Sequence, residues 1–217
     1  MVFLIRAFAA FLALSAVASA EGERAGDFDY YVMALSWNAS WCEREREREG
    51  DACGADQCDP KHDHGFTLHG LWPQSEQGWP SYCRTSKRDP SRRMSGEMTD
   101  IMGSSGLAWY QWKKHGRCSG LSGEDYYRLS RHAYNSVNRP AILRKLPRDM
   151  DLPPSVIEDA FLEANDGLSA DGVTVACRGG YIAEVRICLT RDLKPRDCSY
   201  EVRRDCSAKS ASMPMMR

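Results

Sequence analysis

The chain has 217 residues, of which 42% are hydrophobic and 10% aromatic, enough for one well-buried core. No shift in composition along the chain indicates a second domain. The 29 Lys and Arg nearly balance the 30 Asp and Glu, and the net charge of −1 excludes a protein that attracts polyanions through bulk charge. Any contact with nucleic acid must therefore be locally basic.

The first twenty residues, MVFLIRAFAAFLALSAVASA, predict a secretory signal peptide. Arg6 precedes an apolar stretch at 7–16, and the small residues at 18–20 are typical of a cleavage site. A retained membrane anchor is the weaker alternative, because the apolar stretch is shorter than the about 18 residues that a spanning helix needs. We expect a mature chain that begins at Glu21, is secreted or periplasmic, and has no stable membrane association.

The next segments combine one strand pattern with charged loops. The aromatic-rich run at 28–37 predicts a buried strand. Charges alternate in EREREREGD, at 43–51, which predicts a solvated loop or a short exposed helix without function, because its acids cancel its bases. The His-x-His spacing at 61–64 suggests a metal site, yet no third ligand is obvious nearby, so a surface loop is favoured. FTLHGLWPQ, at 66–74, places His69 between a strand-like apolar run and a Gly-Leu-Trp-Pro turn.

The second half of the chain changes from helical to β patterns. Three segments with cap signals predict helices: 106–116, 122–137 and 155–165. Two β-rich runs within 172–189 predict a hairpin, and the tail from about 207 is predicted to be disordered. Because there is no regular βαβ alternation, we expect an α+β fold, with helices packed around an antiparallel sheet. This fold would form one monomeric domain over 21–217.

Nine cysteines, all downstream of residue 20, are typical of an oxidising compartment, and their odd number leaves one without an internal partner. Cys188 and Cys198 lie within the span from Cys177 to Cys206, which suggests two nested pairs. Cys83 and Cys118 each follow one of the two histidine motifs, and a bond between them would tie these motifs together. Since no CxxC spacing occurs, a zinc cluster is the weaker alternative. Two of Cys42, Cys53 and Cys58 are expected to pair, with a weak preference for Cys42 and Cys58. The predicted disulfides are Cys42–Cys58, Cys83–Cys118, Cys177–Cys206 and Cys188–Cys198.

A second motif, WYQWKKHGRC at 109–118, supplies another histidine, His115, directly after Lys114. Two histidines on separate elements, with a lysine beside one, are what metal-free cleavage of RNA needs. A neutral imidazole takes the proton of the 2′-hydroxyl, an imidazolium protonates the leaving 5′-oxygen, and the cation stabilises the phosphorane. Taken alone, His69 is more often a structural histidine, and the basic residues at a helix end can simply complement the helix dipole.

Together the two motifs resemble the active-site blocks of the ribonuclease T2 family of secreted endoribonucleases, which read close to FTLHGLWP and HEWxKHGTC. The first block is matched fully and is followed by a cysteine. The likeness extends upstream to YYVMALSW and downstream to the cysteines of the C-terminal third. It implies that the first block lies on a strand and the second on a helix, across a cleft. Five residues match the second block: Trp112, Lys114, His115, Gly116 and Cys118.

The resemblance also implies chemical roles without a metal or other cofactor. His115 corresponds to the general base, His69 to the general acid, and Lys114 to the group that stabilises the transition state. The expected products from the RNA substrate are a 2′,3′-cyclic phosphate and, more slowly, a 3′-phosphate.

Recognition of the base depends on a separate group of side chains. Trp72 corresponds to an aromatic that stacks on the base 5′ to the cut, and Gln74 and Tyr82 are further base-binding candidates. Stacking tolerates every base, so we expect a broad base preference. A core tryptophan at position 72 and a purely structural Tyr82 are the alternatives.

The second block departs from the family pattern, because Tyr110 and Gln111 replace its His-Glu pair. A phosphate-binding imidazole and a carboxylate thus give way to neutral groups that can still donate hydrogen bonds to phosphate. The missing carboxylate predicts a lower histidine pKa. The departure bears on the rate and not on the reaction type.

Three classes of function remain open on these residues. The first is an RNA-degrading enzyme, and the second is a catalytically weakened RNA-binding or cytotoxic relative. The third is a disulfide-stapled binding module that does not engage RNA. Cleavage of homopolymeric RNA in a chelator distinguishes the first class, and RNA affinity at low salt distinguishes the second from the third.

Overall fold

A computed structural model describes residues 23–50, 56–62, 64–204 and 206–216. The predicted signal peptide and Cys53 lie outside these residues. Within them, no helix is both long enough and apolar enough to cross a lipid bilayer.

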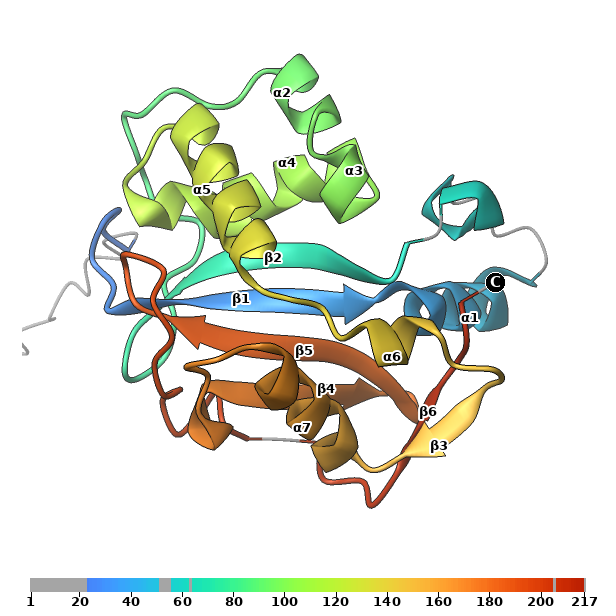
Figure 1. Ribbon diagram of the computed structural model, residues 1–217. Coiled ribbons are helices and arrows are strands. Elements are labelled where there is room, and N and C mark those ends of the chain that lie inside the picture. The colour runs from blue at the N-terminus through green and yellow to red at the C-terminus, as the bar shows by residue number, and fades with distance from the viewer. Residues whose placement is uncertain (1–22, 51–55, 63, 205, 217) are drawn as a thin grey trace, which may run out of the picture.

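Six strands form one sheet, which confirms the expected α+β fold (Figure 1). Neighbouring strands follow the order β2-β1-β5-β6-β3, and β4 pairs with the other edge of β5. Every pairing is antiparallel except the short one between β5 and β6. The strands are β1 Tyr30–Trp37, β2 Phe66–Gln74, β3 Met150–Leu152, β4 Val173–Arg178, β5 Tyr181–Leu189 and β6 Ala211–Met213.

Helices pack around this sheet and connect its strands. The α-helices are α1 Asn38–Glu49, α2 Arg92–Gly96, α3 Thr99–Met102, α4 Ser105–Lys114, α5 Gly123–Ser136, α6 Ala141–Arg144 and α7 Pro154–Ala164. Short 3₁₀ turns are η2 Asp56–Cys58, η3 Pro60–His62, η4 Gly116–Ser119 and η5 Ala170–Gly172.

The two faces of the sheet have different surroundings, because successive side chains of a strand point to opposite sides. In β1, the odd-numbered residues from Tyr31 to Trp37 belong to the main hydrophobic core. Phe161 of α7 belongs to the same core, and α5, α6 and α7 lie in front of the sheet in Figure 1. The even-numbered residues of β1 therefore face the opposite side.

The helices and the hairpin predicted from local patterns are confirmed. Ser104 caps α4 and Ser122 caps α5, each by accepting a hydrogen bond from the backbone. Helix α7 begins at Pro154, so Ser155 lies inside it and is not the cap. The hairpin turns at Gly179 and Gly180, whose positive φ angles of 60° and 85° suit glycine. Residues 43–49 of the charged segment are helical, the second of its two predicted forms, and Asp51 lies outside the described residues.

The prediction of a disordered tail from about 207 is wrong for its central part. Residues 211–213 form β6, in which Met213 is fully buried. Trp37 Nε1 donates a hydrogen bond to the Pro214 carbonyl at 2.8 Å, and Ser212 N donates to Gly180 O at 2.8 Å. The small polar residues of this tail resemble a disordered segment, but its order comes from contacts with distant strands.

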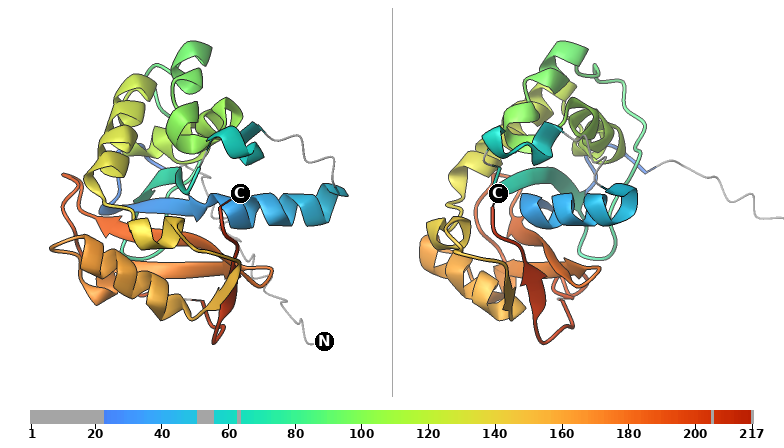
Figure 2. Two further views of the ribbon diagram at one scale, coloured as in Figure 1. Left: turned by 45° about the vertical axis from the view of Figure 1, so that its right-hand side comes forward. Right: turned by 90° about the vertical axis from the view of Figure 1, so that its right-hand side faces the viewer.

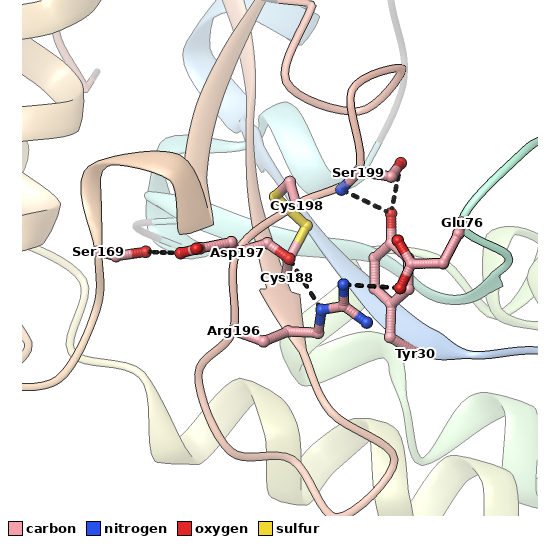
Figure 3. Close-up of a disulfide and its surroundings, with 8 residues drawn as sticks. All are labelled: Tyr30, Glu76, Ser169, Cys188, Arg196, Asp197, Cys198 and Ser199. Atoms are coloured by element: carbon pink, nitrogen blue, oxygen red, sulfur yellow. Dashed lines mark hydrogen bonds and ion pairs between the residues drawn. A yellow bond between two sulfur atoms is a disulfide. The ribbon is translucent and has the colours of Figure 1, made fainter.

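Four disulfides connect the described cysteines in the predicted pairs, including the weakly preferred Cys42–Cys58. Figure 3 shows how the disulfide from Cys188 to Cys198 fixes the segment after β5. There, Tyr30 donates a hydrogen bond from its hydroxyl to Ser199 Oγ at 2.9 Å, and Arg196 lies over the Tyr30 ring. This segment leads to residues that line the candidate site.

Candidate active site

A β-bulge in β2 positions the first predicted histidine. Ala34 pairs with Gly70 and Leu35 with Leu68, so His69 is an extra residue on β2. A bulge turns two consecutive side chains toward one face. A Cβ on Gly70 would lie 2.3 Å from Trp72 Nε1, so Gly70 points to the same side as Trp72. The strand runs on through the predicted Gly-Leu-Trp-Pro turn, because residues 70–74 pair with β1.

His69 is held by a charged pair on β5 that sequence reasoning missed. His69 Nδ1 lies 2.6 Å from Glu184 Oε2, and Arg186 Nε donates to Glu184 Oε1 at 2.7 Å. Ala34 and Ser36 of the intervening β1 pair with Arg186 and Glu184, and their small side chains leave room for the contact across β1. A signal was present in the sequence: two opposite charges at alternate positions inside the apolar run of β5.

The charge state of Glu184 follows from its surroundings. Burial alone would raise the pKa of this carboxyl, but the hydrogen bond and charge of His69, together with Arg186, bring its pKa below the ordinary value. Glu184 is therefore ionised at neutral pH and accepts the hydrogen bond, so the hydrogen lies on His69 Nδ1. The other ring nitrogen, Nε2, is left available for a ligand.

The Trp72 ring contacts both histidines. Its centroid is 5.2 Å from the His69 ring, in an edge-on arrangement, and 5.2 Å from the His115 ring, which stacks on it. Trp72 Nε1 donates to Gln111 Oε1 at 2.7 Å, so the substituted glutamine binds the tryptophan. Trp72 is partly buried: it is absent from the main core and packs against a smaller hydrophobic cluster that includes Tyr30 and Val32.

Helix α4 supplies the second histidine at its C-terminal end. Gln111 and His115 lie one helical turn apart and therefore share a face. His115 is 6% exposed, and its Nδ1 atom has no hydrogen-bond partner within the described residues. Burial, followed by the positive charges of Lys114 and His69, lowers the pKa of His115 to about 3. His115 is therefore neutral at physiological pH, as a general base must be.

Lys114 and two tyrosines lie at the rim of the site. Lys114 Nζ is 5.9 Å from the centroid of the Tyr110 ring. Tyr82 N donates to the Lys114 carbonyl at 2.8 Å, next to the disulfide between Cys83 and Cys118. A hydrogen bond with Tyr110 raises the pKa of the exposed Tyr82 hydroxyl. The two phenols thus meet beside the lysine.

One cavity of about 380 Å³ brings most of the predicted residues together. Tyr82 does not line it, and Gln74 does so with its amide nitrogen already bonded to Gly78 O at 2.8 Å. Unpredicted lining residues include Trp79, Arg186 and Glu201. The predicted residues in its wall are His69, Trp72, Gln74, Tyr110, Gln111, Lys114 and His115.

The alternative of a metal site has no support from geometry. Across residues 23–50, 56–62, 64–204 and 206–216, no three His, Cys, Asp or Glu side chains gather as metal ligands would. His62 and His64 of the His-x-His segment stack on each other, with their ring centroids 5.4 Å apart.

Comparison with known proteins identifies the family. A sequence model of the Ribonuclease T2 family matches residues 28–198, which include both histidine motifs. The chain belongs to the ribonuclease T2 family.

Individual relatives agree with this assignment. A ribonuclease from Aeromonas hydrophila is 42% identical over 54% of this chain and 49% of its own length. Ribonuclease DdI from Dictyostelium discoideum is 26% identical, with 86% of this chain and 85% of that protein covered. The chain spans about half the length of the first two curated relatives that it matches.

Solved structures show the same fold. An RNase-related protein from Calystegia sepium superposes with a TM-score of 0.67 at 22% identity, over 88% of this chain and 98% of that one. Ribonuclease MC1 from the seeds of bitter gourd gives a TM-score of 0.64 at 20% identity, over 87% and 100%. RNase NT, solved in complex with 5′-AMP, gives 0.62 at 24% identity, over 87% and 98%.

Proposed function

We propose that the chain is a secreted or periplasmic endoribonuclease that cleaves single-stranded RNA with broad base preference. The observation that carries this proposal is the shared cavity, in which His69 and His115 both contact Trp72 and Lys114 belongs to the same wall. Family membership and the names of the relatives, most of which are ribonucleases, support RNA as the substrate. The four disulfides support an oxidising location.

In the proposed first step, neutral His115 removes the proton of the 2′-hydroxyl, and the 2′-oxygen forms a bond to phosphorus. The bond from phosphorus to the 5′-oxygen breaks, and His69 gives its proton to that oxygen. Lys114 stabilises the negative charge of the phosphorane, with the neutral donors Tyr110 and Gln111 as weaker assistants. A 2′,3′-cyclic phosphate and a free 5′-hydroxyl result.

Slower hydrolysis of this product follows with the roles of the histidines reversed. His69 then activates water, and His115 returns its proton to the 2′-oxygen, which leaves a 3′-phosphate. The low pKa of His115 does not prevent it from acting as a base. The negative phosphate of bound RNA raises that pKa, because an opposite charge favours the protonated form.

Base binding is assigned to Trp72, Gln74 and Tyr82. Trp72 and Gln74 line the cavity, and Tyr82 is exposed beside its rim, next to Tyr110. Stacking on aromatic rings does not distinguish one base from another, which supports a broad preference. Complexes of related structures with 5′-AMP and 5′-UMP are in keeping with nucleotide recognition by this fold.

The test is incubation with homopolymers of each base and with single-stranded DNA, in excess chelator. We expect every RNA homopolymer to yield 2′,3′-cyclic ends and the DNA to stay intact, because DNA lacks the internal nucleophile. Products with 5′-phosphate ends, or cleavage of the DNA, would contradict the proposed reaction.

A weakened RNA-binding relative is the second candidate, and the neutral Tyr110 and Gln111 favour it. One relative is named a ribonuclease-like storage protein, from Panax ginseng, at 30% identity over 46% of this chain. Tight binding of RNA at low salt without any cyclic product would support this candidate over the enzyme.

A further inference from the structure

A second cavity, of about 850 Å³, adjoins the candidate active site. His69, Trp72 and Arg186 line both cavities, so the two are continuous at these side chains. Away from the histidines, the second cavity reaches α1 and the end of β4, where Arg178 belongs to its wall. Helix α1 continues from β1 and lies beside the β4–β5 hairpin (Figure 2). An RNA strand that extends from the active-site cavity in this direction would pass α1.

The charges of α1 are sorted by the helix, although they alternate in the sequence. Each residue of an α-helix is rotated by about 100° from the one before it. Residues three, four and seven positions apart therefore share a face, and these are the α1 residues that line the second cavity: Trp41, Arg44, Glu45 and Arg48.

Three other charged residues of α1 have partners away from the second cavity. Glu43 and Arg46 pair with each other at 2.8 Å and line a different cavity. Glu47 accepts a hydrogen bond from the Tyr181 hydroxyl at 2.6 Å. On the side of the second cavity, Glu45 and Glu49 both pair with Arg48, so the acids of this segment do not pair with Arg44.

The second cavity, called the groove from here on, has two arginines in its wall whose charge is available to a ligand. Arg48 pairs with Glu45 and Glu49, and Arg186 pairs with Glu184. Within the part of the chain that the structure describes, neither Arg44 nor Arg178 has a carboxylate oxygen within 4.0 Å. The Arg44 side chain lies 4.0 Å from where a Cβ on Gly179 would stand, so it reaches the residue next to Arg178. The two cations thus come from neighbouring elements, α1 and the end of β4.

We propose that Arg44 and Arg178 form a distal phosphate-binding subsite for a single-stranded RNA that extends beyond the scissile linkage, with the half-buried Trp41 offering a surface for a base. Arginine suits this position, because its planar guanidinium binds phosphate oxygens in pairs. The chemistry is that of nonspecific single-strand binding, in which a basic groove with aromatic side chains follows the backbone. The inference rests on the proposed function, since it extends the same RNA past the catalytic cavity.

The test compares Arg44→Ala/Arg178→Ala with the natural chain on two substrates, a long homopolymer and a dinucleoside monophosphate. Only the homopolymer reaches the distal subsite. We expect kcat/KM for the homopolymer to fall by about two- to fivefold per arginine, the range of exposed ion pairs, and to fall much less for the dinucleotide. Arg46→Ala is the matched control, because it removes the same charge from the other side of the same helix.

Binding gives a second readout that does not depend on cleavage. The probe is a 2′-O-methyl oligonucleotide of about twelve residues, which has no free 2′-hydroxyl. The slope of log Kd against log salt should decrease in the double variant by roughly 0.7 for each lost phosphate contact, and should stay unchanged in Arg46→Ala.

The outcomes separate this inference from the proposed function. An equal loss on both substrates, or an unchanged salt slope in the double variant, would overturn the distal subsite. Failure of the natural chain to cleave either substrate would overturn the proposed function. The distal subsite would then be decided by the binding assay alone, where an affinity equal to that of the natural chain would reject it.

Discussion

The two histidines of the cavity have opposite environments. His69, with 36% of its side chain exposed, bonds to an ionised carboxylate, whereas His115 is buried, with cations nearby. Burial beside cations favours the neutral form of the His115 imidazole. The neutral form agrees with the proposed base at position 115, and the contact with Glu184 orients the proposed acid at position 69. The two motifs indicated both histidines. Glu184 could not be found in this way, because it comes close to His69 only when β2 and β5 lie on either side of β1 in the folded sheet.

Replacing Glu184 tests its role in positioning the acid. We expect Glu184→Gln to lower kcat by about tenfold or more with little change in KM, because the loss affects the orientation of His69 and not the binding of RNA. Glu201→Gln removes another carboxylate of the same cavity, one that bonds to Gly78 N, and should have a much smaller effect. Equal effects of the two substitutions would refute the role of Glu184.

The substitution Gln111→Glu tests how the departure from the family pattern sets the pH profile. A base must be neutral, so kcat/KM falls in acid as His115 takes up a proton. With a pKa of about 3, this acid limb should lie far below pH 6.5 in the natural chain. A carboxylate at position 111 raises the pKa of His115, so the acid limb should move to higher pH.

The comparison for this shift is Gln77→Glu, a substitution at an exposed glutamine outside the cavity. It should leave the acid limb where it is in the natural chain. If the pH profile of Gln111→Glu coincides with that of the natural chain, position 111 is not coupled to His115.

At the scale of elements, the site depends on one irregular strand and one capped helix. Cap residues are local signals, and the start of α5 after Ser122 was predictable from sequence for that reason. The bulge at His69 was not predictable, because it exists only in the pairing of β2 with β1. The sequence therefore indicated a turn where the strand in fact continues.

Gly70→Ala tests the importance of the bulge. A Cβ at this position would lie 2.3 Å from Trp72 Nε1 and 2.4 Å from Gln111 Oε1, the two atoms of the hydrogen bond that joins β2 to α4. We expect a loss of about 1–3 kcal/mol in the free energy of unfolding and a larger loss of activity than of folded protein.

Gly96→Ala, on α2, is the control, since a Cβ there meets no atom within 4 Å. Urea unfolding and RNA cleavage should both stay close to those of the natural chain. Natural activity in Gly70→Ala would show that the contact between Trp72 and Gln111 is not needed.

At the scale of the whole molecule, distant segments are tied to the site by covalent bonds and by the sheet. The disulfide from Cys83 to Cys118 joins the segment that carries Tyr82 to the turn after α4. The disulfide pairs could be predicted from the order of the cysteines in the sequence. The burial of Met213 in the tail could not, because it depends on the pairing of β6 with β3 in the folded sheet. Composition alone describes the tail as polar and misses that contact.

Replacing Cys83 and Cys118 by alanine should lower the free energy of unfolding by about 3–4 kcal/mol, as expected for a closed loop of 35 residues. The folded fraction should also show a lower kcat, because Lys114 and His115 directly precede this anchor. Urea unfolding with assays below the transition separates the two effects. The same change at Cys42 and Cys58 should reduce stability with a smaller effect on cleavage of a dinucleotide.

The most direct test of the central claim is cleavage of homopolymeric RNA in excess chelator by the natural chain, His69→Ala and His115→Ala, each shown to be folded by its thermal unfolding. If two imidazoles act on one phosphate without a metal, the natural chain cleaves the RNA in the chelator, and the activity of each variant is lower by at least about hundredfold. Near-natural activity in either variant, or loss of the natural activity on addition of the chelator, would contradict the account.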